Sequence, residues 1–292
     1  MTDRGSILCP RCKKLISDYV EECPHCNLKN PARKEAIFSR LMIFRRSYVK
    51  VIISITAVFL VVSYLIPFFI SIDVPTGRDM FGLIPSPSSV SLNLLGWADI
   101  RLVLAGNWWV LVTAIFLHGG ILHILFNMLW VRDLAPQVEI LFGPHNMLTL
   151  YVLSGIGGNL VALFSPIILN MLFGLRMPSY PVVGASGAVF GLMGAMIAFG
   201  RKRGGFFGRQ MARQIGMWAL ILIVMGFLFP GISNAAHIGG FVTGLLVAYL
   251  LFLQKNPAQS TVATIIAIIV SGICLLSFLM MAMRLVQIVA RL

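Results

Sequence analysis

Five side chains that can do chemistry stand inside apolar stretches of this 292-residue chain. Ser186 lies in GASG, His237 lies in AHIGG, and His118, His123 and Asn127 lie in HGGILHILFN. A serine activated by a histidine is a nucleophile, and nearby N–H donors stabilise the oxyanion that its attack creates. Histidines also ligate metals and line ion paths. The residue types therefore indicate either nucleophilic catalysis or a site for a metal or ion.

The surroundings of these residues favour catalysis. The apolar stretches contain no Asp or Glu, whereas a metal site usually recruits a carboxylate or a further ligand. A metal path would use only the histidines, while catalysis uses the serine, the histidines and the asparagine together. The structural alternative is that Ser186 bonds a backbone carbonyl and its glycines merely pack helices.

Close helix packing and catalysis support each other in this sequence. Small residues at helical spacing let two backbones approach closely. A short serine side chain meets a histidine on a neighbouring helix only where the backbones are that close. The glycines at this spacing are Gly184, Gly187, Gly191 and Gly194, with Gly240 and Gly244 following His237.

The elements that position these residues are predicted to be membrane-spanning helices. The chain is 58% hydrophobic and 11% charged, whereas a soluble domain has about 25% charged residues. Runs of roughly 20 apolar residues are long enough to cross a bilayer. The predicted fold class is an all-α polytopic membrane protein, with spans near 51–71, 111–131, 146–165, 183–200, 214–231, 234–253 and 261–283.

The charge pattern predicts the orientation of the chain. The net charge is +13, and the basic residues gather in residues 1–50 and in RKRGGFFGRQMAR at 201–213. Both clusters are cytoplasmic if the N-terminus is cytoplasmic, as the positive-inside rule requires. Basic residues beside a span attract the head groups of the lipid bilayer, and we expect no nucleic-acid partner. In this orientation the serine, His123, Asn127 and His237 share one layer on the external side.

The N-terminal segment carries a separate pattern. CPRC (Cys9, Cys12) and CPHC (Cys23, Cys26) can place four thiolates around one ion. Two such turns enclose no hydrophobic core, so metal binding would supply their folding free energy. We expect a structural zinc in a small zinc ribbon over residues 1–30, rather than iron or redox chemistry. His25 is expected to be a solvated turn residue, and residues 31–50 form a basic linker.

The three membrane motifs together resemble the rhomboid family of intramembrane serine proteases. HGGxxHxxxN, GASG and AHIGG occur in that order on the second, fourth and sixth predicted spans. The resemblance implies a six-helix core over 51–255, and residues 256–292 add one helix in a 6+1 arrangement. It implies Ser186 as nucleophile and His237 as general base. It also implies an oxyanion hole built from His123, Asn127 and the Ser186 backbone N–H.

The resemblance also assigns supporting residues. His118, Gly184, Gly187 and Gly240 would be structural, and Phe190 would stack on the catalytic histidine where some bacterial members have tyrosine. Charged residues are implied at the end of the long first loop, where this chain has Asn107 and Val110.

The family resemblance implies that the substrates are transmembrane proteins and that catalysis needs no cofactor. The protein would lie in a bacterial plasma membrane with its site open to the external side. Two alternatives remain at this stage: an inactive rhomboid-like protein that binds membrane clients, and a histidine-dependent transporter. The sequence does not predict an oligomeric state.

Overall fold

The computed structural model describes residues 6–9, 14–17, 20–30, 48–70, 77–78, 84–229, 231–253 and 260–290. The chain divides into two compact units, Met1–Ser47 and Tyr48–Leu292. Most of the predicted basic linker lies outside the described residues, and its last three residues begin a helix rather than ending a linker.

The small unit is built on short antiparallel pairings. Strand β1 (Ser6–Leu8) pairs with β2 (Leu15–Ser17), with Ile7 opposite Ile16. A second pairing joins Glu22 to Lys29. Each pairing leads the chain into or out of a cysteine turn, and Ile16 is buried beside the cysteines. So few apolar residues make a very small core, as the cysteine pattern implies.

The large unit is a helical bundle, which confirms the predicted all-α polytopic fold. Among the residues that the structure describes, five of its helices are long and apolar enough to cross a membrane. They are α2 (Tyr48–Phe69), α7 (Pro144–Phe173), α9 (Gly205–Leu228), α10 (Asn234–Leu251) and α11 (Thr261–Val289).

Two more helices complete the bundle in the described part of the chain. They are α6 (Ile121–Phe142) and α8 (Ser186–Arg203). Helix α8 occupies the predicted fourth span, although its last turn carries Arg201, Lys202 and Arg203. It packs against α6, α7, α9 and α10, which makes it the central helix of the bundle.

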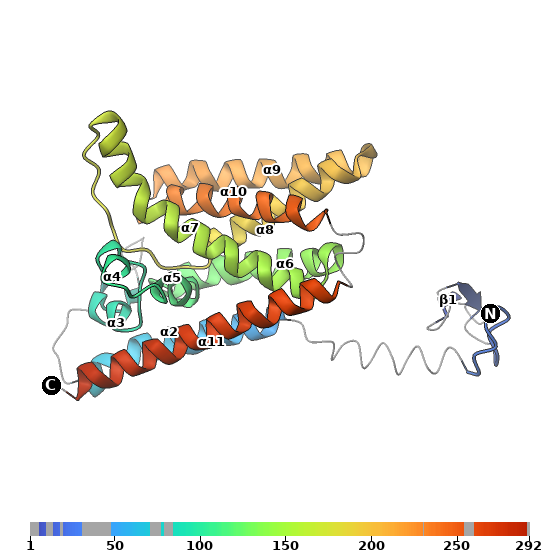
Figure 1. The fold of residues 1–292 in the computed structure, drawn as a ribbon, viewed down its shortest axis with the longest axis horizontal. Coiled ribbons are helices and arrows are strands. Elements are labelled where there is room, and N and C mark those ends of the chain that lie inside the picture. The colour runs from blue at the N-terminus through green and yellow to red at the C-terminus, as the bar shows by residue number, and fades with distance from the viewer. Residues whose placement is uncertain are drawn as a thin grey trace. The chain divides into compact units, whose positions relative to one another are not determined.

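Short helices fill the stretch between α2 and α6, and we call them the first-loop helices. They are α3 (Ser89–Leu94), α4 (Ile100–Leu104), α5 (Val110–Thr113) and the 3₁₀ turn η1 (Ala114–Phe116), preceded by a small hairpin of β3 (Gly77–Arg78) and β4 (Pro85–Ser86). They gather at the end of the bundle where α6, α8 and α10 begin and α11 ends, which we call the site end (Figure 1).

Side-chain caps fix the first-loop helices. Ser88 accepts the backbone N–H of Ser91 at the start of α3, and Asp99 accepts that of Arg101 at the start of α4. Both are favoured N-cap residues. The Arg101 guanidinium also donates to the Asp99 carboxylate at 2.7 Å, and these hydrogen bonds lower the pKa of Asp99 below its usual value. The loop is therefore a structured element.

The predicted second span, 111–131, is wrong as a continuous helix. Helices α5 and η1 make an angle of 91° with α6, and the chain turns at residues 117–120. Gly120 has φ of +151°, a conformation that other residues rarely adopt. The turn places His123 in the first turn of α6 and Asn127 in its second, at the site end.

Three helices meet backbone to backbone just inside the site end. A Cβ added at Gly158 of α7 would lie 2.7 Å from the Ala236 oxygen of α10 and 3.3 Å from the Cα of Gly187 on α8. One turn further, Gly240 of α10 lies directly against the backbone of Gly187, and Gly244 against that of Gly191. The contacting atoms are backbone, so none can rotate away to admit a side chain.

We predict that Gly244→Ala lowers the unfolding midpoint of the detergent-solubilised protein. The added methyl group meets the Gly191 backbone, and overpacking of this kind costs about 1–3 kcal/mol. Gly272→Ala is the matched control, since nothing lies within 4 Å of its added Cβ on α11. Equal midpoints for the two variants would show that the α8–α10 contact is not tight.

Candidate active site

Ser186 is the first residue of α8, and a tight turn delivers it there. Gly184 has φ of +122° and donates its N–H to the Ala114 oxygen at 2.9 Å. Gly184 was predicted to be one of the helical glycines, and this is wrong, because α8 begins two residues later. The first N–H groups of a helix have no acceptor within it. Ser186 therefore lies at the end of α8 where the backbone N–H groups have no acceptor within the helix.

The turn before Ser186 is tied to the first-loop helices. Val182 and Ala98 exchange two backbone hydrogen bonds, of 3.0 and 2.8 Å. Ala185 donates its N–H to Nε2 of His118 at 3.4 Å, and His118 is 1% exposed. Residues 182–185, which we call the delivery turn, are thus held on both sides by the segment that precedes α6.

His237 lies in the first turn of α10 and faces the same side of α8 as the serine. Its ring stacks on that of Phe190, with centroids 4.2 Å apart and planes 13° apart. Phe190 is four residues after Ser186, so the two share one face of α8. His237 is 6% exposed, and its Nδ1 has no hydrogen-bond partner among the described residues. The structure therefore places His237 against the face of α8 that begins with Ser186.

His123 presents a donor to the delivery turn. Its Nδ1 lies 3.3 Å from the Gly119 N–H and accepts from it. A neutral imidazole that accepts at one nitrogen carries its proton on the other, so Nε2 is the donor. A Cβ added at Gly184 would lie 2.7 Å from this Nε2. The N–H of His123 therefore points to the backbone just before Ser186.

Asn127 and His118 complete the cluster. Asn127 is 7% exposed and donates one amide N–H to the His123 oxygen at 2.9 Å, one turn back along α6. Its second N–H is not used in that bond. The rings of His118 and His123 meet edge to face, with centroids 4.9 Å apart. The result is a buried polar layer of His118, His123 and Asn127 next to the turn that leads into α8.

Comparison with known proteins places this layer in a family. Residues 105–254, just over half of the chain, match the model of the Rhomboid domain. The chain belongs to the rhomboid family. The match includes all the motif residues in the membrane unit and ends before α11.

This rhomboid is similar to proteins from a plant and from a bacterium. It is 35% identical to RHOMBOID-like protein 4 of Arabidopsis thaliana, over 58% of this chain and 41% of that protein. It is 33% identical to Rhomboid protease GluP of Bacillus subtilis, over 59% of this chain and 32% of that protein. Putative rhomboid protease YdcA of Bacillus subtilis is 32% identical over 52% of this chain and 71% of that protein.

Sequence reasoning missed several polar contacts of this rhomboid. Tyr48 and Nδ1 of His145 form a hydrogen bond of 3.1 Å at the end of the bundle opposite the site, joining α2 to α7. Asn159 donates to the Leu111 oxygen at 2.9 Å and so joins α7 to α5. The hydroxyls of Tyr151 and Ser154 on α7 are buried, with no partner among the described residues. Polar residues in an apolar span are the signal that could have found them.

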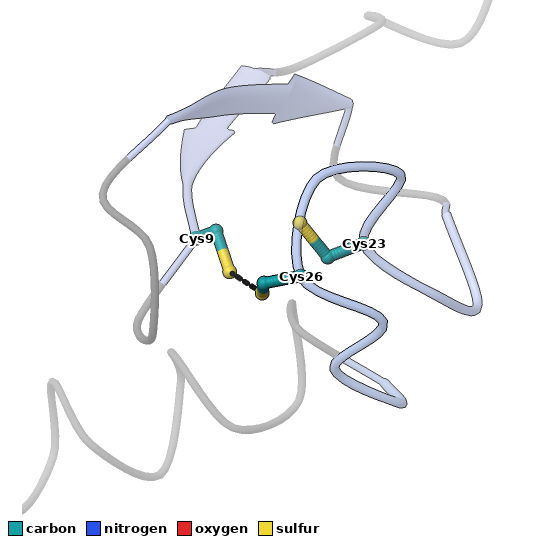
Figure 2. Close-up of side chains that lie close together, drawn as sticks. All are labelled: Cys9, Cys23 and Cys26. Atoms are coloured by element: carbon teal, nitrogen blue, oxygen red, sulfur yellow. Dashed lines mark hydrogen bonds between the residues drawn. The ribbon is translucent and has the colours of Figure 1, made fainter.

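The cysteines of the small unit form a separate cluster. The sulfurs of Cys9, Cys23 and Cys26 all lie within 4.8 Å of one another, and Figure 2 shows the three side chains close together. Cys9 and Cys26 are 3.6 Å apart, close to the roughly 3.8 Å between two sulfurs that each lie about 2.3 Å from a tetrahedral zinc. Cys12 lies outside the described residues. His25 is exposed, as expected for a solvated turn residue.

We predict that Phe190→Leu exposes the imidazole of His237. The substitution removes an aromatic stack worth about 0.5–1.5 kcal/mol. Carbethoxylation of His237 by diethylpyrocarbonate, followed by peptide mass mapping, should become severalfold faster. Phe190→Tyr retains the ring face and should react at the wild-type rate. The same rate in all three proteins would mean that the stack does not cover His237.

Proposed function

We propose that this rhomboid is an intramembrane serine endopeptidase with Ser186 as nucleophile and His237 as general base. The observation that carries the proposal is the stack of His237 on Phe190, the residue one helical turn beyond Ser186 on the same face of α8. The glycine contacts between α8 and α10 support it, because they bring the first turns of both helices together. Two of the relatives carry the word protease in their names.

The chemistry begins with attack of Ser186 Oγ on the carbonyl carbon of a peptide bond. His237 takes the hydroxyl proton, and the carbonyl oxygen becomes an oxyanion. The intermediate collapses when His237 gives that proton to the leaving amine, and the C–N bond breaks. Water then attacks the acyl-enzyme, with His237 again acting as base, and Ser186 recovers its proton as the new carboxylic acid leaves.

The oxyanion would lie among N–H donors at the start of α8. The backbone N–H of Ser186 is one, and Nε2–H of His123 and the second amide N–H of Asn127 are the others. Donors fixed before the reaction stabilise developing charge without reorganising, and removal of one typically costs about 2.7–4 kcal/mol of transition-state stabilisation. The bonds from Gly119 to His123 and from Ala185 to His118 support this preorganisation.

The substrates we propose are transmembrane proteins, cut close to one face of the bilayer. The site end holds the polar cluster, and the basic residues of α8 lie in the last turn, at the other end of that helix. Under the positive-inside rule the basic end is cytoplasmic, so the site end would be external. We propose a bacterial plasma membrane as the location, and catalysis that needs no cofactor.

We predict that Ser186→Ala and His237→Ala each reduce cleavage of a model transmembrane substrate in proteoliposomes by at least about a thousandfold. Ser186→Ala should also abolish labelling by a fluorophosphonate, because its Oγ is the attacking atom. His145→Ala is the matched control, a histidine at the opposite end of the same helical unit, and should retain activity. Labelling and cleavage at the wild-type level in Ser186→Ala would eliminate the dyad.

We further propose that the small unit binds structural zinc through Cys9, Cys12, Cys23 and Cys26. Three described sulfurs already lie at separations suited to one tetrahedral ion. Backbone N–H groups in cysteine turns, such as those of Cys9 and Cys23, are held by the Lys14 and Leu28 oxygens at 2.9 and 3.0 Å. A structural ion contributes folding free energy directly in units of this size.

Zinc content is expected to fall from about one ion per chain to near zero in the Cys9→Ser, Cys12→Ser double variant, because two thiolate ligands are lost. Cys274→Ser is the control, since this cysteine lies on α11. Plasma emission spectrometry of the purified, full-length proteins measures the metal. An unchanged content in the double variant would remove the zinc assignment and leave the dyad untouched.

A further inference from the structure

Arg284 is the single charged residue of α11. Its Nη1 donates to the backbone oxygen of Asn93 at 2.9 Å, and its Nη2 donates to the side-chain oxygen of the same residue at 3.1 Å. The guanidinium carbon lies 5.8 Å from the ring centre of Trp109. A charged side chain in an apolar span is costly and marks a function by default. Here Nη1, Nη2 and the flat face of the guanidinium all contact the first-loop segment.

The contact sits on a second, smaller hydrophobic core at the site end. Trp109 is 1% exposed in this core. Leu117 directly precedes His118, and Val183 lies within the delivery turn, so the core reaches the motif residues themselves. Its buried members are Ile66, Leu92, Leu94, Leu95, Trp109, Val110, Leu117 and Met281, with Val183 packed against them.

Hydrogen bonds continue the connection to the nucleophile. Gly96 lies directly against the Trp109 ring, and its oxygen accepts the hydroxyl of Thr113 at 2.6 Å. Two residues later, Ala98 pairs with Val182 of the delivery turn. The path from Arg284 to Val182 in the delivery turn therefore consists of contacts that the structure shows, joined by a short stretch of chain.

The first loop has no charged side chain where the resemblance implies one. Val110 is fully buried in the second core, and the Asn107 N–H is used within the loop, on the Leu102 oxygen. Arg284 supplies a charge-assisted contact to the same loop from a distant helix. Arginine suits the role because its planar fork makes two hydrogen bonds and its face stacks on an aromatic ring, which lysine does not reproduce.

We propose that Arg284 is a positioning residue for catalysis, through which the seventh helix holds the first-loop helices and, with them, the delivery turn. Arg284 does not touch the substrate. The proposal rests on the proposed protease function for its kinetic consequence. Both Arg284 and Asn93 lie outside residues 105–254, so the contact belongs to the part of this chain that the family match does not cover.

The test compares full-length Arg284→Met, Arg284→Lys and Arg101→Met in proteoliposomes. Arg101→Met is the matched control, because Arg101 belongs to a first-loop helix but its side chain is 80% exposed. For a transmembrane substrate we expect Arg284→Met to lower kcat about tenfold or more with little change in KM, since misplaced catalytic groups slow the chemical step. Arg284→Lys, which keeps the positive charge and N–H donors but not the planar fork, should recover part of kcat, and Arg101→Met should behave as wild type.

Amide hydrogen exchange provides a readout that does not depend on protease activity. The Val182 and Gly184 N–H groups bond to the Ala98 and Ala114 oxygens. In Arg284→Met these two amides should exchange at least about tenfold faster, because local opening becomes easier. The amides of α8 near Gly191 should be unchanged. Asn93→Ala, a milder change, should shift the same amides in the same direction.

The outcomes separate the two proposals. If the wild type neither labels nor cleaves, the protease function fails, while faster exchange confined to the delivery turn still supports the positioning role of Arg284. If exchange at Val182 and Gly184 is unchanged in both Arg284→Met and Asn93→Ala, the positioning role is wrong. Equal losses of kcat in Arg284→Met and Arg101→Met would also overturn it. Uniformly faster exchange throughout the bundle would mean that Arg284 only stabilises the fold.

Discussion

The structure depends on the contact between three helix backbones at Gly158, Gly187 and Ala236. A serine side chain is one of the shortest that carries a nucleophile, and it cannot span the usual 8–10 Å between packed helix axes. Helix α10 therefore has to lie unusually close to α8, and glycine makes this possible on both sides. The position of His237 over Phe190 follows from that approach, as does the burial of α8 at the centre of the bundle.

The sequence predicted the helical membrane bundle and the family well, because both are encoded in short local stretches of the chain. Apolar length reports directly on membrane spans, and each motif contains its own polar residues and glycines. Two details escaped it because hydropathy does not register backbone conformation. An apolar stretch that includes Gly119 and Gly120 reads as a single span, although the chain bends there. Gly184 falls at helical spacing from Gly187, although its positive φ lies in a turn.

Contacts between distant segments were beyond sequence reasoning. With the seventh span predicted to end at residue 283, Arg284 fell just outside it, whereas α11 continues to Val289. Its partner Asn93 is 191 residues away, in a loop where the sequence offered no further chemistry. The proposed zinc ribbon is the opposite case, because two CxxC turns would supply all of its ligands from one short segment. The contrast shows that the spacing of residues within one motif can be read from a single sequence, whereas contacts between distant segments cannot.

The contact between α8 and α10 is made by backbone atoms, and this limits which substitutions the protein can accept. Along the faces where these helices meet, almost any side chain larger than hydrogen separates them, so the first turns of α8 and α10 form a nearly invariant frame. The delivery turn and the first-loop helices are held instead by individual hydrogen bonds and by side chains of ordinary size. New substrate preferences, whether by natural divergence or by directed evolution, should therefore accumulate in residues 84–117 and 178–185. A mutant library restricted to those segments would sample site shapes while leaving the frame intact.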